Sequence, residues 1–209
     1  MAHFVDTVAE YLLQMAVLAV PAAVVFLCFW PYRQRAINAM GLKTSLLREA
    51  ALVIFVMTIF GNLAVTLKPT LVWESTPGVW GDLTLFIERP NMMTNVNLTP
   101  FYMFRIYKAS YGLGDLMYII INFLGNMAVF IPMGLFPALL FREARWYRSA
   151  LVGCGLSVFI EVSQYFLMRQ TDIDDVILNT LGALWGYWLY LLMKRFFPVF
   201  TAKFQCHKK

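Results

Sequence analysis

Charged residues are scarce in this sequence: Asp, Glu, Lys and Arg make up 14% of its 209 residues, whereas hydrophobic residues make up 60%. A soluble domain of this size has too little interior to bury so many apolar side chains, so lipid must solvate part of the chain. Cysteine and histidine are scarce too, and no CxxC, HExxH, Ser-His-Asp or Cys-His arrangement is present. The sequence therefore indicates no zinc site, no disulfide framework and no common hydrolase nucleophile.

Five apolar stretches are long enough to cross a bilayer, for which a helix needs about 20 residues. They are Tyr11–Trp30, Ala50–Leu67, Leu116–Phe141, Ser149–Met168 and Val176–Phe197. Pro132 and Pro137 in the third stretch predict a kink or an early end of that helix. Gly182 and Gly186 in the fifth form a motif for close helix packing. We therefore predict an all-α fold, a polytopic membrane bundle of about five transmembrane helices.

The basic residues predict the orientation of these helices, because Lys and Arg accumulate in cytoplasmic loops. Twelve of the 17 basic residues fall in two predicted loops, 31–49 and 142–148, and in the C-terminal residues 194–209, which a five-helix chain places on one side. The N-terminus should therefore lie outside and the C-terminus in the cytoplasm. This distribution accounts for the net charge of +5 without nucleic acid, which we do not expect as a partner.

We predict a single membrane domain over residues 1–209 with four parts. Two N-terminal helices (1–67) precede an external aromatic loop (68–115), a three-helix core (116–197) and a basic cytoplasmic tail (198–209). Long loops without secondary structure are usually functional or disordered, and this one is too apolar for disorder. We expect it to lie in the membrane interface, where Trp and Tyr are favoured.

Glu161 is the one charged residue well inside a predicted span, about two turns from the outer end of the fourth helix. An ionised carboxylate is costly there, so its presence suggests a functional site. Ser157 and Gln164 share its helix face, and with Gly153 and Cys154 they form a small, polar stripe that should face the bundle. The alternative is a protonated or paired Glu161 that only ties helices together.

A second polar cluster, Arg169–Asp175, leads into the fifth helix. Thr171 or Asp172 can cap this helix, and Asp174 and Asp175 would then stabilise its positive end, with Asp174 as a surface acid. Three acids in one short segment could also bind Ca²⁺ or Mg²⁺. The segment lacks the glycine and closing glutamate of an EF-hand loop, however, so we predict neither a metal site nor another cofactor.

Amide side chains on the third and fifth helices should lie at about the same depth in the membrane as these acids. Asn179 lies one turn below Asp175 on the same helix face, and Asn122 and Asn126 are spaced i, i+4 near the outer end of the third helix. Amides inside a bundle need hydrogen-bond partners. We therefore predict that the third, fourth and fifth helices form one polar pocket open to the outside, with Asn97–Phe101 as its lid.

Four segments of the chain together resemble the VanZ-like family, which is named for a membrane protein associated with low-level resistance to the glycopeptide teicoplanin. They are Asn97–Phe101, Asn122–Gly134, Glu161–Gln164 and Arg169–Gly182, and the resemblance covers about Asn97 to Tyr190. It implies a multi-pass protein of the bacterial plasma membrane. It also marks seven polar residues without assigning their roles: Asn122, Asn126, Glu161, Gln164, Arg169, Asp175 and Asn179.

The resemblance implies an envelope protein whose outer pocket binds a lipid-linked cell-wall precursor or the lipid tail of a glycopeptide antibiotic. The ligand-binding candidates are Asn97, Asn122, Asn126, Gln164, Asp172 and Asn179. The alternative is an enzyme acting on a lipid or glycan at the outer face. Its candidate catalytic groups are Glu161 as general acid or base, Asp175 as second carboxylate and Arg169 as anion-binding residue. A small-molecule carrier is less favoured, because no inverted repeat is visible.

Overall fold

The computed structural model describes the backbone of residues 2–67, 69–74, 82–87, 96–101, 113–167 and 169–208; side chains are described at 12–67, 96–101, 123–167 and 169–208. Five long helices dominate it, and each contains a stretch long and apolar enough to cross a membrane. The prediction of an all-α, five-helix membrane bundle is therefore confirmed. The five helices are α1 (Ala2–Ala39), α2 (Leu46–Leu67), α4 (Leu113–Leu140), α5 (Trp146–Phe166) and α6 (Ile173–Phe196).

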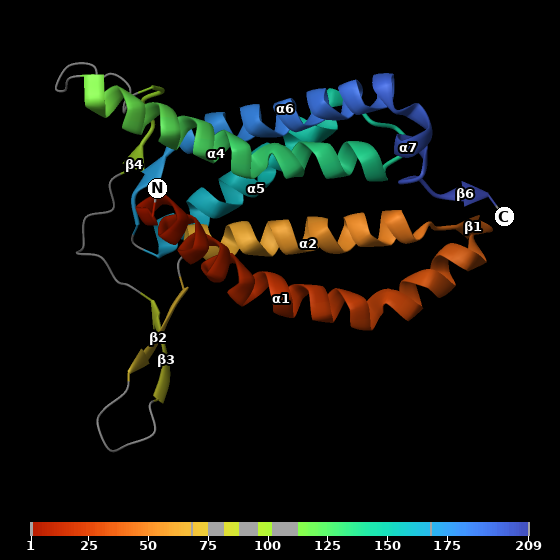
Figure 1. Cartoon of the computed structure of the whole chain (residues 1–209), viewed down its shortest axis with the longest axis horizontal. Coiled ribbons are helices and arrows are strands. Elements are labelled where there is room, and N and C mark those ends of the chain that lie inside the picture. The colour runs from red at the N-terminus through yellow and green to blue at the C-terminus, as the bar shows by residue number, and fades with distance from the viewer. Residues whose placement is uncertain are drawn as a thin grey trace.

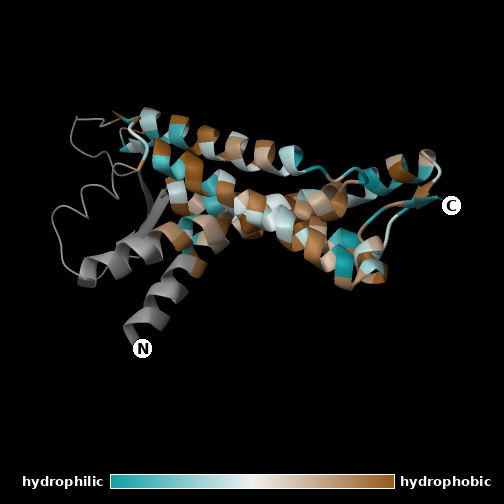
Figure 2. Cartoon of the chain, turned by 90° about the horizontal axis from the view of Figure 1, so that it is seen from above, coloured by the Kyte–Doolittle hydropathy of each residue, from teal (hydrophilic) through white to brown (hydrophobic). Residues whose placement is uncertain are grey.

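The helices run roughly along one common direction, with α2 between α1 and the group formed by α4, α5 and α6 (Figure 1). The N-terminus lies near one end of the bundle and the C-terminus lies at the other, as five spans require. Hydrophobic residues dominate the middle of the helices, and hydrophilic residues gather towards both ends (Figure 2). We call the end that carries the C-terminus the basic end and the opposite end, predicted to be extracellular, the outer end.

Prolines do not end two of the helices. α1 continues through Pro31 to Ala39, so the predicted start of a loop at Pro31 was wrong. α4 continues through Pro132 and Pro137 to Leu140, so neither proline ends that helix early, and the alternative of a kink stays a prediction. A proline removes only one backbone hydrogen bond, and packing against neighbouring helices offsets that loss in membrane proteins.

The closest packing in the bundle joins α4 to α6 through glycines. Gly182 and Gly186 on α6 touch the backbone of α4 at the carbonyl groups of Met127 and Ile131, and Gly134 on α4 touches the carbonyl group of Ala183. Small residues allow helix backbones to approach closely where there is no hydrophobic drive between helices. The packing role predicted for Gly182 and Gly186 is therefore confirmed.

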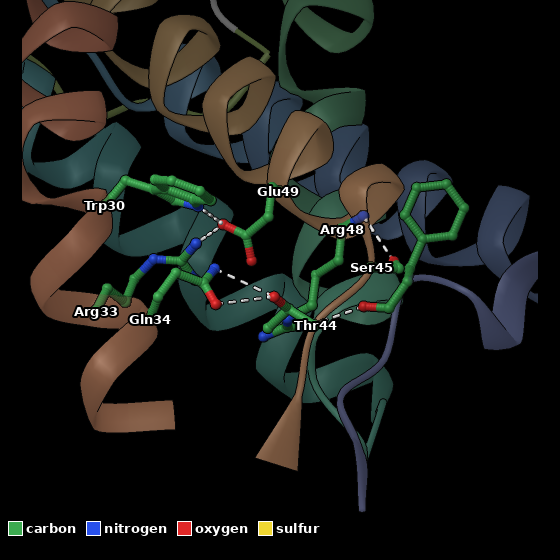
Figure 3. A network of polar contacts seen from close by, with 8 residues as sticks. Trp30, Arg33, Gln34, Thr44, Ser45, Arg48 and Glu49 are labelled. Carbon is green, nitrogen blue, oxygen red and sulfur yellow. Dashed lines mark hydrogen bonds and ion pairs between the residues drawn. The ribbon is translucent and has the colours of Figure 1, made fainter. Parts of the chain in front are cut away.

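Polar contacts tie α1 to α2 at the basic end (Figure 3). Glu49 of α2 is buried, accepts a hydrogen bond from the Trp30 indole at 3.1 Å and forms an ion pair with Arg33 of α1. A buried carboxylate needs such partners, because an unpaired one would be strongly destabilising. The sequence prediction placed Arg33 in a loop and therefore missed this pair.

The C-terminal tail folds back onto the same end. After the short helix α7 (Pro198–Ala202), strand β6 (His207–Lys208) pairs antiparallel with β1 (Leu42–Lys43) of the α1–α2 connection. Phe204 is buried in a cluster with Tyr190 and Leu140, and its carbonyl accepts a hydrogen bond from Arg48 at 2.8 Å. The tail is thus a packed part of the bundle.

The external loop contains strands that its composition did not reveal. β2 (Pro69–Glu74) and β3 (Asp82–Ile87) pair antiparallel as a hairpin, with Pro69 opposite Ile87. The expectation of a loop without secondary structure was therefore wrong for these residues. The predicted interfacial position concerns aromatic side chains that lie outside the described residues and stays a prediction. Further along, β4 (Val96–Asn97) pairs with β5 (Thr171–Asp172) just before α6.

The predicted orientation can be tested by cysteine labelling in intact cells. In a variant without Cys28, Cys154 and Cys206, we expect an impermeant thiol reagent to modify a cysteine placed at Ser75 but not one placed at Ala144. The reason is that Ser75 lies in the external loop and Ala144 lies in a basic loop. Labelling at Ala144 before the cells are opened would reverse the topology, and labelling at both sites only after lysis serves as the control for reactivity.

Candidate functional site

α5 carries its polar residues on the face that packs into the bundle. Ser157 and Glu161, one turn apart, are both buried, and Ile160 beside them belongs to the apolar core formed with Phe130 and Ala183. The bundle side of α5 is thus polar towards its outer end, as its sequence predicted. A carboxylate held there needs hydrogen-bond donors, because burial removes most of its contact with water.

The start of α6 supplies the donor for Glu161. Asp172 caps α6 by accepting a hydrogen bond from the backbone amide of Asp174 at 2.9 Å, so one of the two predicted caps is confirmed. The backbone amide of Asp172 itself points the other way and donates to Oε2 of Glu161 at 2.9 Å. The turn that begins α6 therefore fixes the buried carboxylate of α5, and both acids occupy one site.

The segment Asn97–Phe101 closes this turn from the outside. β4 runs parallel to β5 with Asn97 opposite Asp172, and the Asn97 amide nitrogen donates to both carboxylate oxygens of Asp172 at 3.1 and 3.2 Å. The backbone amide of Phe101 donates to Asp174, and Phe101 adopts a left-handed conformation with φ of 59°. The predicted lid therefore contacts the acids at the start of α6.

Asp174 is not the surface acid that the sequence suggested. It is 4% exposed, and while one carboxylate oxygen accepts from Phe101, the other is buried without a hydrogen-bond partner among the described residues. The expectation failed because helix-end position alone does not reveal that a loop 73 residues earlier covers the same turn. Asp174 is a buried member of the cluster.

Two further pairs lie along α6. Asn126 of α4 donates to Asp175 at 2.9 Å, and Asn179 donates to the Ser157 hydroxyl at 2.8 Å. The amides of α4 and α6 therefore find partners on facing helices, as their matching depth predicted. The side chain of Asn122 lies outside the described residues.

Gln164 and Arg169 point to α2 instead of to the acids. The Gln164 side-chain nitrogen donates to the carbonyl of Thr66 at 3.0 Å, and the Arg169 guanidinium donates to the same oxygen. The last turn of a helix has carbonyls without intrahelical partners, and these two side chains satisfy one of them. Within the described part of the chain Arg169 forms no ion pair with Glu161; the ion pairs there are Arg33–Glu49 and Arg148–Glu143.

An open apolar groove of about 420 Å³ runs beside the buried carboxylates, between α5, the start of α6 and the β4 segment. Val158, Val162 and Tyr165 of α5 form one wall, and Val96 and Leu98 form another. The polar side chains that reach it are those of Glu161, Thr171 and Asp172. The hydroxyl of Thr171 is buried and has no hydrogen-bond partner among the described residues. The groove thus combines apolar walls with a small polar floor, the usual composition of a small-molecule site.

A family model described as VanZ/LLP1 matches residues 52–194, which is more than half of the chain. The chain belongs to the VanZ/LLP1 family. Protein VanZ of Enterococcus faecium is 37% identical to it over 71 residues, which cover 34% of this chain and 44% of that protein. The aligned part is thus less than half of that relative's length. No solved structure matches this chain.

The VanZ/LLP1 match begins in α2, earlier than the motif resemblance from Asn97 onwards. In the structure α2 is joined to the later part of the matched region, because the carbonyl oxygen of Thr66 accepts hydrogen bonds from the side chains of Gln164 and Arg169. Asn62, one turn earlier, is 1% exposed and donates to the carbonyl of Val129 on α4 at 3.3 Å. The sequence analysis missed both residues, although a lone amide in the apolar run of α2 was a usable signal.

The acids of this VanZ/LLP1 protein are arranged for amide donors. Glu161, Asp172, Asp174 and Asp175 each accept from a backbone or side-chain N–H group. In the part of the chain that the structure describes, no group of three or more His, Cys, Asp or Glu side chains is placed to hold a metal ion. The cluster thus places hydrogen-bonded carboxyl groups beside an apolar groove.

Proposed function

We propose that this protein binds a lipid-linked cell-wall component or a lipoglycopeptide at the outer leaflet of a bacterial plasma membrane. Binding would lower the access of teicoplanin to its target and so lower susceptibility to that antibiotic. The observation that carries the proposal is the apolar groove with Glu161, Thr171 and Asp172 at its floor. Membership of the VanZ/LLP1 family supports it, together with the similarity to Protein VanZ.

The position of the groove suits an amphiphile. Val158 and Val162 are 44% and 49% exposed on the lipid-facing side of α5, so a hydrocarbon chain can enter from the bilayer without crossing water. An apolar wall gives little preference over lipid, because lipid tails are as apolar as the wall. Selectivity must therefore come from the polar floor.

The polar floor offers an acceptor that the protein does not use itself. Glu161 accepts the Asp172 amide through Oε2, and the described part of the chain provides no hydrogen bond to Oε1. Oε1 of Glu161 can therefore accept a hydrogen bond from a hydroxyl, amide or amine group of a glycan or peptide headgroup.

Filling the groove tests this proposal. We expect Val162→Trp to abolish retention of a fluorescent lipid-linked cell-wall precursor and of teicoplanin by the purified protein, because the indole occupies the space of the chain. The control is Leu151→Trp, because Leu151 is also exposed on α5, at 67% against 49% for Val162, and does not line the groove. Deacylated teicoplanin should bind neither protein, since it lacks the chain that the groove receives.

The same variants decide whether binding explains resistance. In a strain without the chromosomal gene, Val162→Trp should lose protection against teicoplanin, and Leu151→Trp at equal membrane abundance should keep it. Undiminished ligand binding and protection by Val162→Trp would exclude the groove as the site.

A membrane-embedded enzyme acting at the outer face is the second candidate. It is favoured by one feature, namely that two carboxyl groups, Glu161 and Asp172, line the groove directly. General acid–base catalysis requires such groups within reach of the substrate. Mass spectrometry of envelope lipids and glycans distinguishes the two candidates. An enzyme predicts a product that disappears in Glu161→Gln, whereas a binding protein predicts unchanged chemical species.

A further inference from the structure

A second cleft, of about 290 Å³, lies at the basic end between the last turns of α4 and the first turns of α5. Its walls are apolar: Pro137 and Ala138 come from α4, Phe141 directly follows α4, and Val152 comes from α5. Phe141 is 58% exposed, so the cleft opens onto the surface that faces lipid. Its rim is polar: Glu143 and Arg145 come from the α4–α5 connection, and Arg148 comes from the first turn of α5.

The rim offers positive charge that the protein leaves free. Arg145 lines the cleft and is exposed, and it makes no side-chain hydrogen bond or ion pair among the described residues. Arg148 pairs with Glu143 at 3.3 Å, but both side chains are exposed, and an exposed pair of this kind is weak. The buried hydroxyl of Ser149 is already used, because it donates to the carbonyl of Gly134 at 3.0 Å. The free polar group of the cleft is therefore the Arg145 guanidinium.

The start of α5 adds further donors at the same place. Arg145 is the N-cap residue of this 21-residue helix and provides no side-chain cap. The first-turn amides of Trp146 and Tyr147 have no hydrogen-bond partner in the described part of the chain. Amides at a helix N-terminus favour a negative group, and phosphate is a common one. Trp146 is 60% exposed, as expected for a side chain at a membrane interface.

We infer that this cleft binds one anionic phospholipid of the inner leaflet, with its phosphate at Arg145 and the α5 N-terminus and one acyl chain along Val152 and Phe141. Charge selects an anionic headgroup, because the loop 142–148 carries three arginines against one glutamate. The apolar, lipid-facing walls select a lipid over free phosphate. The site is separate from the groove beside Glu161, here called the outer groove, since the two share no lining residue.

Native mass spectrometry of the full chain tests this inference. The detergent-purified protein is mixed with equal amounts of phosphatidylglycerol and phosphatidylcholine that carry the same acyl chains. We expect a single retained lipid, with phosphatidylglycerol favoured severalfold. Arg145→Gln should remove most of this preference, and Val152→Trp should remove retention of both lipids by filling the cleft.

Arg142→Gln is the matched control, because Arg142 lies in the same loop, is equally exposed and does not line the cleft. It removes the same charge and should keep the preference for phosphatidylglycerol. Equal losses in Arg142→Gln and Arg145→Gln would show nonspecific attraction to a basic loop and overturn the inference. Equal retention of the two lipids by the wild type, or displacement of the lipid by inorganic phosphate, would overturn it as well. Size-exclusion profiles confirm that each variant is folded.

Discussion

We expect Gly186→Ala to destabilise the bundle strongly, although it adds a single methyl group. A Cβ at this position would lie 2.7 Å from the Leu135 amide nitrogen and closer still to the Ile131 carbonyl oxygen. Both obstacles are backbone atoms of α4, which cannot rotate away as a side chain can, so α4 and α6 must separate. Overpacking a tight core typically costs about 1–3 kcal/mol, and a backbone obstacle places this change at the upper end.

The measurement is thermal unfolding of the purified protein in detergent, followed by size-exclusion chromatography. Gly155→Ala is the control, because Gly155 is an exposed helix position at which a Cβ would meet nothing within 4 Å. Alanine is favoured over glycine in a helix by about 1 kcal/mol, so this variant should match or exceed the wild type. Equal unfolding temperatures for Gly186→Ala and the wild type would mean that α4 and α6 do not meet closely at this glycine.

We expect Glu161→Gln to abolish protection against teicoplanin while leaving the protein folded. Glutamine keeps the shape of the side chain, and its amide oxygen can accept the hydrogen bond that the Asp172 amide now gives to Oε2. The other carboxylate oxygen becomes an NH₂ group, which puts a donor where the proposed ligand requires an acceptor. Growth in a teicoplanin series, with membrane abundance checked by blot, measures the effect.

Two comparison variants sharpen this result. Ser163→Ala removes a hydroxyl that donates only to the Phe159 carbonyl of its own helix, and it should keep full protection. Asp174→Asn should also lose protection, because Asp174 is buried and accepts a hydrogen bond from the backbone amide of Phe101 in the covering segment, Asn97–Phe101. A fully active Glu161→Gln protein at normal abundance would indicate that Glu161 serves only to tie α5 to α6.

Features that depend on local sequence were predictable. The five spans follow from apolar length, the Asp172 cap follows from the residue types before α6, and the Gly182–Gly186 packing follows from small residues four positions apart. Each of these depends on residues within one or two helical turns. Local physical chemistry is enough to specify them.

Features that depend on distant segments were not predictable. The Asn97–Asp172 pair joins residues 75 positions apart, and the burial of Asp174 depends on the same covering segment. The continuation of α1 through Pro31 likewise brings Arg33 to Glu49, a pairing that becomes visible only once α1 and α2 pack together. In each case tertiary contact overrides the tendency of the local sequence.

The parallel pairing of β4 with β5 sets the order in which the outer groove can form during synthesis. Ribosomes make Asn97 and Phe101 before the residues that receive their hydrogen bonds, Asp172 and Asp174. A nascent chain that has inserted α1, α2 and α4 therefore has no groove to offer. The wall, the floor and the covering segment come together only when the last span enters the bilayer. Retention of the proposed ligand would therefore require the complete bundle, and we expect truncation before α6 to eliminate it.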